Sequence, residues 1–315
     1  MAELALYLYW TSVVTAPIAA VLYWAYVGSA AIAVRRVAAQ TSAGTVSVSL
    51  PAGAPSAGLG RLATTFTGLT ALFLAGWVAT RWAARGYAPL SNLYEFTTAF
   101  AFGICAAYLV FERTSRNRRY GALVLPIVVA MLGIAATFPK EIVPLIPALQ
   151  NGPLLTIHVS VMMLSYAVLT VAFCAAVVYL AQGGEGKRRF AALPSAEAAG
   201  DLAHRAVLVG FPLLGLGIAL GAWWANSAWG RYWGWDPKET SALVTWLSLV
   251  AYFHARAGSG SVAAAPGIRR LVPARLRRGW RPDPMWWLVV MWGLVMFTYF
   301  GVNLWISGLH SYAGV

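Results

Sequence analysis

Charged residues are scarce in this chain. Of its 315 residues only 10% are charged and 60% are apolar, and the mean hydropathy is +0.67. A soluble globular domain carries about 25% charged residues, so that class is excluded. Cysteine is also rare: Cys105 and Cys174 lie in apolar runs and form no C-x-x-C or C-x-x-C-H motif. The chain is therefore neither a thioredoxin-like reductant nor a c-type cytochrome, and both thiols are interpreted as packing groups.

Motifs for hydrolysis and phosphate handling are absent from the sequence. It contains no G-x-S-x-G, no P-loop and no H-E-x-x-H. No pair of acidic residues lies inside an apolar run, where it would indicate a proton relay. Serine hydrolase, nucleotide-binding and zinc protease functions are thus not expected.

Long apolar runs dominate what is present. A helix that crosses the hydrocarbon core needs about 20 mostly apolar residues. Eight runs meet this length: 5–27, 63–82, 93–111, 120–138, 153–182, 206–225, 237–256 and 285–308. Three starts carry Asn or Asp ahead of Pro, which is typical of a helix N-terminus: Asn151-Gly152-Pro153, Asp236-Pro237 and Asp283-Pro284. The sequence predicts an all-α integral membrane protein of eight transmembrane helices.

The basic residues predict the orientation of these helices. Of the 23 Lys and Arg residues, 18 lie in the first, third, fifth and seventh connections, and five lie on the opposite side. By the positive-inside rule both termini are extracytoplasmic. The net charge of +13 then follows from topology, and no nucleic acid partner is expected.

Two parts of the chain are distinguished. Residues 1–62 comprise the first span and a cytoplasmic loop over 36–62, and residues 63–315 form the main membrane domain, which includes a basic loop over 257–284. Glu3 lies ahead of the first run and no basic segment does, so we expect this run to remain a span rather than to be a cleaved signal peptide.

One segment, residues 223–240, is rich in tryptophan. Six of the 15 tryptophans fall within 24 residues: Trp223, Trp224, Trp229, Trp233, Trp235 and Trp246. An interfacial aromatic belt is one interpretation. The other is a platform for a flat, polarizable ligand, formed by Trp229, Tyr232, Trp233 and Trp235, with Arg231 and Lys238 as cations for its acidic groups. Asp236 and Glu239 have the spacing of a capping box that opens the next helix.

The four histidines differ in predicted depth. His158 and His310 lie on the same side as the tryptophan-rich segment, and a pair of neutral imidazoles can close both axial positions of a haem iron. His254 lies about 25 Å along its helix from Pro237, near the cytoplasmic end. It is interpreted either as an interfacial histidine or as a functional group within the membrane that binds a second haem or a partner's residue. His204 precedes its span among charged neighbours and is expected to be solvated and inert.

These elements together resemble the CcsA (also ResC) family of the cytochrome c synthesis system called system II, a group of haem-handling membrane proteins with a tryptophan-rich WWD domain. The matching motifs are Pro89-Leu90-Ser91-Asn92-Leu93-Tyr94-Glu95, His158-Val159-Ser160 with Leu164-Ser165-Tyr166, Gly210-Phe211-Pro212-Leu213-Leu214, the run 229–239, His254-Ala255-Arg256, and Gly301-Val302-Asn303 leading to Gly308-Leu309-His310-Ser311-Tyr312. They cover about 225 residues in the family's order, and the run 229–239 and the Gly-Leu-His-Ser-Tyr ending are the most specific.

The resemblance implies a subunit of a holocytochrome c synthase in a bacterial cytoplasmic or thylakoid-type membrane. It would take up haem b as its substrate, work with a CcsB/ResB-like membrane partner, and serve apocytochrome c, with a thiol-reducing protein upstream. His158 and His310 match the family's two external haem ligands, and His254 matches the ligand within the membrane. Two alternatives stay open: a haem carrier or exporter without ligation activity, and a transporter of another hydrophobic solute.

Overall fold

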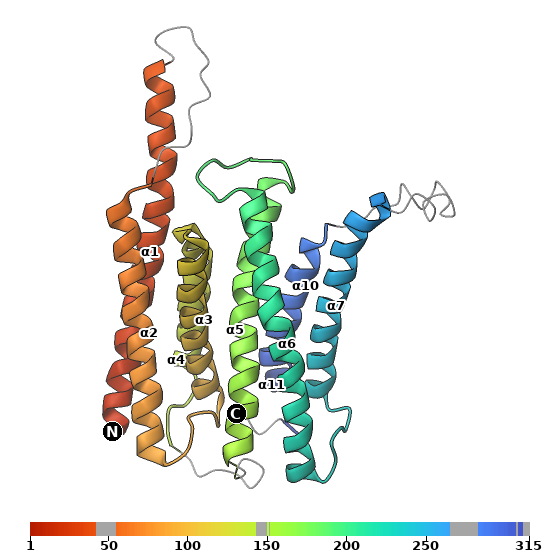
Figure 1. Ribbon diagram of the computed structural model, residues 1–315. Coiled ribbons are helices and arrows are strands. Elements are labelled where there is room, and N and C mark those ends of the chain that lie inside the picture. The colour runs from red at the N-terminus through yellow and green to blue at the C-terminus, as the bar shows by residue number, and fades with distance from the viewer. Residues whose placement is uncertain (42–54, 143–149, 151, 265–282, 307, 311–315) are drawn as a thin grey trace.

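The computed structural model describes residues 1–41, 55–142, 150, 152–264, 283–306 and 308–310. All regular structure in this part of the chain is helical, which confirms the predicted fold class (Figure 1). The main helices are α1 (Ala2–Thr41), α2 (Ala57–Arg85), α3 (Leu93–Ser115), α4 (Gly121–Thr137), α5 (Gly152–Gln182), α6 (Ala196–Trp229), α7 (Pro237–Ala264) and α10 (Met285–Met296). Short elements are η1 (Arg118–Tyr120) ahead of α4, and the π-helical η3 (Phe297–Gly301) and α11 (Val302–Trp305), which continue α10.

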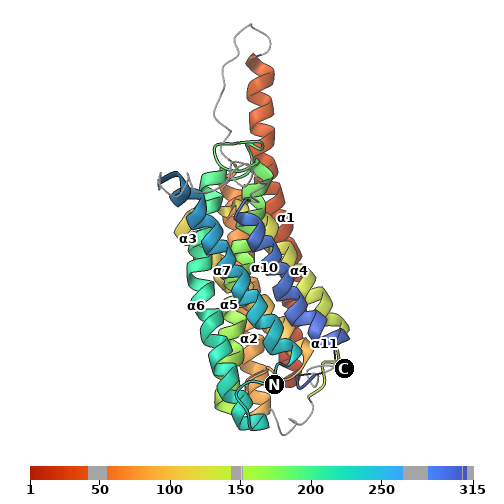
Figure 2. The same ribbon diagram turned by 90° about the vertical axis from the view of Figure 1, so that its right-hand side faces the viewer.

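The helices lie side by side along one long axis in both views (Figures 1 and 2). Helix α5 packs on α6 and α1 packs on α2, while α3 and α10 both pack against α5. The N-terminus of α1, the connection from α6 to α7 and the end of the α10–η3–α11 line all lie toward one end of the bundle (Figure 1). This is the end that the sequence predicts to be extracytoplasmic.

Seven of the eight expected spans are long and apolar enough to cross a membrane. Helix α7 is the eighth, and its 28 residues begin with Pro237, Lys238 and Glu239. Its composition is more polar than that of the others, because Ser241, Thr245 and Ser248 also lie along it. These three hydroxyls are buried, where each donates to a backbone oxygen of its own helix. The chain is an integral membrane protein with multiple spans, and a crossing by α7 stays a prediction.

Two of the three predicted helix starts are confirmed in atomic detail. Asp236 Oδ1 accepts a hydrogen bond from Lys238 N at 2.9 Å, and α7 begins at Pro237. Asp283 Oδ1 accepts from Met285 N at 2.9 Å, where α10 begins. The third helix, α5, begins at Gly152, and the Asn151 ahead of it lies outside the described residues.

Helix α6 is longer at both ends than the sequence predicts, and this changes two interpretations. It begins at Ala196, so His204 lies inside the helix rather than ahead of it in solvent. It ends at Trp229, so the first half of the tryptophan-rich segment is helical and only residues 230–236 form the connection. Ser195 accepts from Ala198 N at 3.3 Å and fixes the early start. Gly230 ends the helix at φ 73°, a left-handed conformation that glycine adopts without strain.

The two long loops are also shorter than predicted. Helix α1 continues to Thr41 and α2 begins at Ala57, within the expected loop 36–62. Helix α7 continues to Ala264, within the expected loop 257–284. The remainder of both loops, 42–54 and 265–282, lies outside the described residues.

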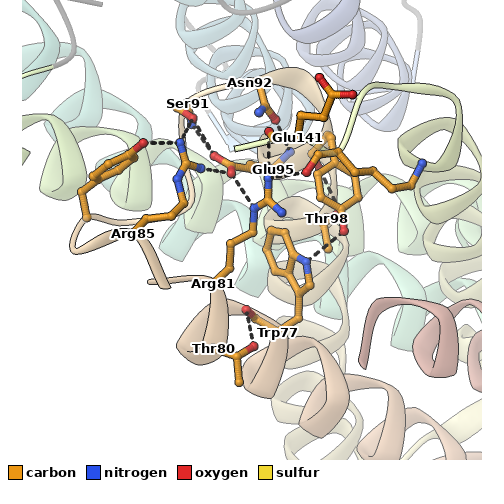
Figure 3. A network of polar contacts seen from close by, with 12 residues as sticks. Trp77, Thr80, Arg81, Arg85, Ser91, Asn92, Glu95, Thr98 and Glu141 are labelled. Carbon is orange, nitrogen blue, oxygen red and sulfur yellow. Dashed lines mark hydrogen bonds and ion pairs between the residues drawn. The ribbon is translucent and has the colours of Figure 1, made fainter. Parts of the chain in front are cut away.

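A buried polar cluster joins α2 to the start of α3 (Figure 3). Glu95 is completely buried and accepts from Arg81 Nε at 2.6 Å and from Arg85. Its second oxygen accepts from Ser91 N at 3.0 Å and Ser91 Oγ at 2.8 Å. Asn92 begins α3 by accepting from Glu95 N at 2.9 Å. The connection from α2 to α3 lies toward the same end of the bundle as the connection from α6 to α7 (Figure 1).

Candidate functional site

A pocket with a cavity volume of about 140 Å³ lies between α5, α6, α7 and the η3–α11 end of the α10 line. Its wall is mostly apolar, with Met162, Met163 and Phe96 among the residues that face it. Two of the predicted iron ligands, His158 and His310, line this pocket, although they are far apart in the chain. A mostly apolar pocket with a few convergent polar groups is the usual form of a ligand site.

His158 lies on α5 and is held against α6. Its Nδ1 lies 2.8 Å from the backbone oxygen of Gly217, and because a carbonyl oxygen only accepts, Nδ1 carries the proton. The neutral imidazole therefore has its lone pair on Nε2. Its ring lies nearly parallel to that of Trp224, with ring centroids 6.3 Å apart and planes 8° apart. Gly221 also packs on it: a Cβ at this position would lie 2.6 Å from His158 Cε1.

His310 lies on a turn beyond the end of α11, and its side chain lines the same pocket. Its Nδ1 lies 2.7 Å from Asp236 Oδ1. The ring contacts Trp224 and Trp229, with centroids 5.8 Å and 4.8 Å away. Burial lowers the pKa of the His310 imidazole below its ordinary value, although the hydrogen bond to Asp236 raises it. His310 is thus neutral near pH 7, which is the form that ligates metals.

Asp236 has two functions, of which the sequence predicted one. As expected, it begins α7 as a capping residue, and Glu239 Oε2 accepts in return from Asp236 N at 3.1 Å. It also bonds His310, which the spacing along the chain could not indicate. Burial raises the pKa of the Asp236 carboxyl, but the hydrogen bonds from His310 and from two backbone N–H groups outweigh it and bring the pKa to about 2. Asp236 is therefore an anion that accepts hydrogen bonds at neutral pH.

Lys238 supplies a cation to the same pocket. It lines the wall together with Trp233, and its Nζ donates to Asn303 Oδ1 at 2.7 Å. Asn303 follows the π-helical η3, whose Thr298 and Tyr299 also face the pocket. Single-turn π-helical segments of this kind are frequent at functional sites.

Comparison with known proteins identifies the family of this chain. The profile of the cytochrome c assembly protein family matches residues 90–265. The chain is 35% identical to the cytochrome c biogenesis protein CcsA of Synechococcus elongatus over 306 residues, which is 81% of this chain and 88% of that protein. It is 35% identical to CcsA of Gloeothece citriformis over 307 residues and 33% identical to CcsA of Porphyra purpurea over 300 residues, with the same coverage. The chain belongs to the cytochrome c assembly protein family.

As a member of this family, the chain is a membrane protein of c-type cytochrome biogenesis. The region that matches the cytochrome c assembly profile contains His158, the tryptophan-rich segment and His254, and it ends ahead of His310. His310, which lines the pocket together with His158, therefore lies outside the matched region.

Only part of the tryptophan-rich segment of this family member faces the pocket. Trp233 lines it, and Trp229 packs on the outer side of His310. Tyr232 and Trp235, by contrast, are 61% and 69% exposed, and Arg231 is exposed too. The Arg231 guanidinium lies against Gly234 rather than in the pocket. The predicted platform of four aromatic rings is thus divided, with two rings near the histidines and two on the surface.

Trp224 is the functional candidate that sequence reasoning missed. It belongs to the recognised cluster, but periodicity alone could not tell it from its neighbour Trp223. In the structure Trp224 is 1% exposed and contacts both His158 and His310, whereas Trp223 is 60% exposed. Among the described residues no acceptor lies within hydrogen-bond distance of the buried Trp224 Nε1.

The other two histidines lie far from the pocket. His254 is exposed on α7, and its Nδ1 lies 2.9 Å from Val250 O of the same helix. His204 on α6 is partly buried, with Nδ1 3.2 Å from Tyr252 OH and its ring against Phe253. The expectation of a solvated His204 is therefore wrong, because α6 begins early enough to place the residue at the α6–α7 interface.

Proposed function

We propose that the chain is the haem-handling subunit of a system II cytochrome c synthase, and that His158 and His310 ligate the iron of haem b in the pocket. The observation that carries this proposal is that the two histidines line one pocket and that both contact Trp224. In each, Nδ1 is bonded to an acceptor within the protein, so Nε2 is the nitrogen through which it would bind iron.

The other groups of the pocket suit the remaining parts of haem. The apolar wall suits the macrocycle, and Trp233 would contact its edge. Lys238 would pair with a propionate, because its ammonium is the cation on the pocket wall. The buried Trp224 Nε1 supports a bound ligand with a hydrogen-bond acceptor, since buried donors are rarely left without one.

The chemistry proposed at this pocket is covalent attachment to apocytochrome c. Each thiol of the Cys-x-x-Cys-His motif would add across one vinyl group of haem, forming a C–S bond and transferring its hydrogen to the adjacent carbon. The histidine of the motif would replace one axial ligand. The chain would contribute positioning and iron ligation rather than a nucleophile, and it would act with a CcsB/ResB-like partner.

His254 would act earlier, as haem crosses from the cytoplasmic side. It lies about 18–24 Å along α7 from the pocket residues Ala242 and Lys238 and is exposed on that helix. An ionisable residue in a membrane helix is costly and therefore a functional candidate. With His254 toward the cytoplasmic side, the α6–α7 connection would lie at the outer surface. Its exposed residues Arg231, Tyr232 and Trp235 would then be where the apocytochrome or the partner approaches.

The test is the absorption spectrum of the reduced protein, purified with its partner, together with a pyridine haemochrome assay. We expect a low-spin b-type spectrum in the wild type, lost or converted in H158A and H310A and partly restored by added imidazole. H204A is the matched control, since it removes a histidine far from the pocket. A carrier without ligation activity would bind haem in this way but would attach none to apocytochrome. A wild-type complex without haem would overturn the proposal and favour transport of another solute.

A further inference from the structure

The turn that carries His310 is docked on Asp236 at three consecutive residues. Asp236 Oδ1 lies 2.7 Å from His310 Nδ1, and Oδ2 accepts from Leu309 N at 2.6 Å. Gly308 lies so close that a Cβ there would be 2.6 Å from Asp236 Oδ2 and 3.1 Å from Pro237 Cδ. The side chain of Asp236 therefore fills the space that this glycine leaves, and its carboxylate binds the next two residues.

The two candidate iron ligands are supported in different ways. His158 lies within a 31-residue helix, and its partner Gly217 belongs to a second long helix. His310 instead lies beyond the end of α11, and its imidazole bonds the carboxylate of the residue that begins α7. A ligand on a turn is placed by the groups that hold the turn, and here the Asp236 carboxylate bonds two of its residues.

We propose that Asp236 is the positioning residue for His310: it docks the 308–310 turn on the start of α7 and fixes the Nδ1–H form of the imidazole, so that Nε2 is presented to iron. This inference rests on the proposed haem-binding function. It assigns to the aspartate of the tryptophan-rich segment a task beyond capping, namely joining the ligand to the helix that also carries Lys238. Carboxylates bonded to the far nitrogen of a ligating histidine act in this way in metal sites.

The inference predicts a selective effect on one ligand. In D236A the His158 side of the pocket keeps its contacts, while His310 loses the acceptor of its Nδ1–H and the anchor of its turn. We expect haem occupancy to fall about 10-fold or more, the usual range for such partners being 10- to 100-fold. The residual haem should have the spectrum of iron with one histidine ligand, and added imidazole should restore the six-coordinate spectrum.

Two further variants separate positioning from helix capping. D236N keeps a good capping residue, and its Oδ1 can still accept from His310, but its amide donor faces Leu309 N–H. G308A leaves Asp236 and its cap intact and pushes the turn away sterically. S195A is the control, because it removes the side-chain cap of another helix, far from the turn. We expect G308A to behave like D236A, D236N to be intermediate, and S195A to match the wild type.

A measurement without haem keeps the inference separate from the proposed function. In the full chain in lipid bilayers, ¹⁵N NMR of the four histidines, assigned with H310A, reports which ring nitrogen carries the proton. We expect Nδ1–H for His310 in the wild type and a mixture of tautomers in D236A and G308A. Unchanged Nδ1–H in both variants would overturn the inference. If D236A and G308A bind as much haem as the wild type and have its spectrum, the inference is also overturned, but the proposed function stands. If the wild-type protein binds no haem, only the proposed function is overturned.

Discussion

A single added methyl group at Gly221 should displace His158 and so test the pocket from the His158 side. Gly221 lies on α6 opposite the His158 ring, and an alanine Cβ there would be 2.6 Å from Cε1, 3.1 Å from Nδ1 and 3.2 Å from Nε2. Carbon atoms in favourable contact are about 3.5–4.0 Å apart. The imidazole must therefore move by about 1 Å, away from α6.

This displacement should affect both the stability of the protein and its activity. It breaks the hydrogen bond between His158 Nδ1 and Gly217 O, which lies on the same face of α6 and contributes about 0.5–1.5 kcal/mol. It also shifts Nε2 relative to the iron position, and a misplacement of about 1 Å at a reacting centre can reduce the rate about 100-fold. The substitution should not weaken α6 itself, since alanine is more favourable than glycine in a helix by about 1 kcal/mol.

The assay is the yield of c-type cytochrome in cells that depend on this chain, together with the haem spectrum of the purified protein. We expect G221A to lose most cytochrome assembly while its thermal unfolding midpoint stays close to that of the wild type, because the gain in helix propensity and the lost hydrogen bond are of similar size. G133A is the matched control, because a Cβ at Gly133 in α4 meets nothing within 4 Å. If G221A assembles cytochromes as well as G133A and retains the wild-type spectrum, the placement of His158 against α6 is refuted.

Three other substitutions test neighbouring contacts. W224A should lower the free energy of unfolding by about 3–5 kcal/mol and reduce bound haem, because Trp224 is buried against both histidines. K238M should reduce haem retention at equal protein yield, because it removes the ammonium that lines the pocket. E95Q should destabilise the protein by about 3–5 kcal/mol in thermal unfolding, since it leaves two buried guanidinium groups without their counter-charge.

Two of these substitutions have a matched control variant within the chain. W223A removes the exposed neighbour of Trp224 and should change both measurements much less. R231M removes a cation outside the pocket and should retain more haem than K238M. Equal effects within either pair would contradict the site as described. For the buried cluster, an unfolding midpoint of E95Q equal to that of the wild type would show that Glu95 does not neutralise the arginines.

Apolar runs and helix-start motifs predicted the architecture because both are local. A membrane helix needs a run of apolar residues, and such a run is visible in one dimension. The same holds for the starts at Asp236 and Asp283, whose side chains bond backbone N–H groups two residues away. Helix ends were less predictable: α6 continues in both directions through residues of mixed polarity, and this moved His204 and Trp229 into a helix.

The sequence by itself determined the fold class and the family, and it singled out the two histidines that we propose as iron ligands, because composition, apolar runs and motifs are properties of neighbouring residues. Only the tertiary structure decided which side chains meet. Trp224 faces the histidines and Trp223 faces outward, although they are adjacent, because successive residues of a helix point in directions about 100° apart. Asp236 and His310 are 74 residues apart, and their contact depends on how α11 ends beside the start of α7. Such contacts are set by the packing of whole helices, which no local pattern encodes.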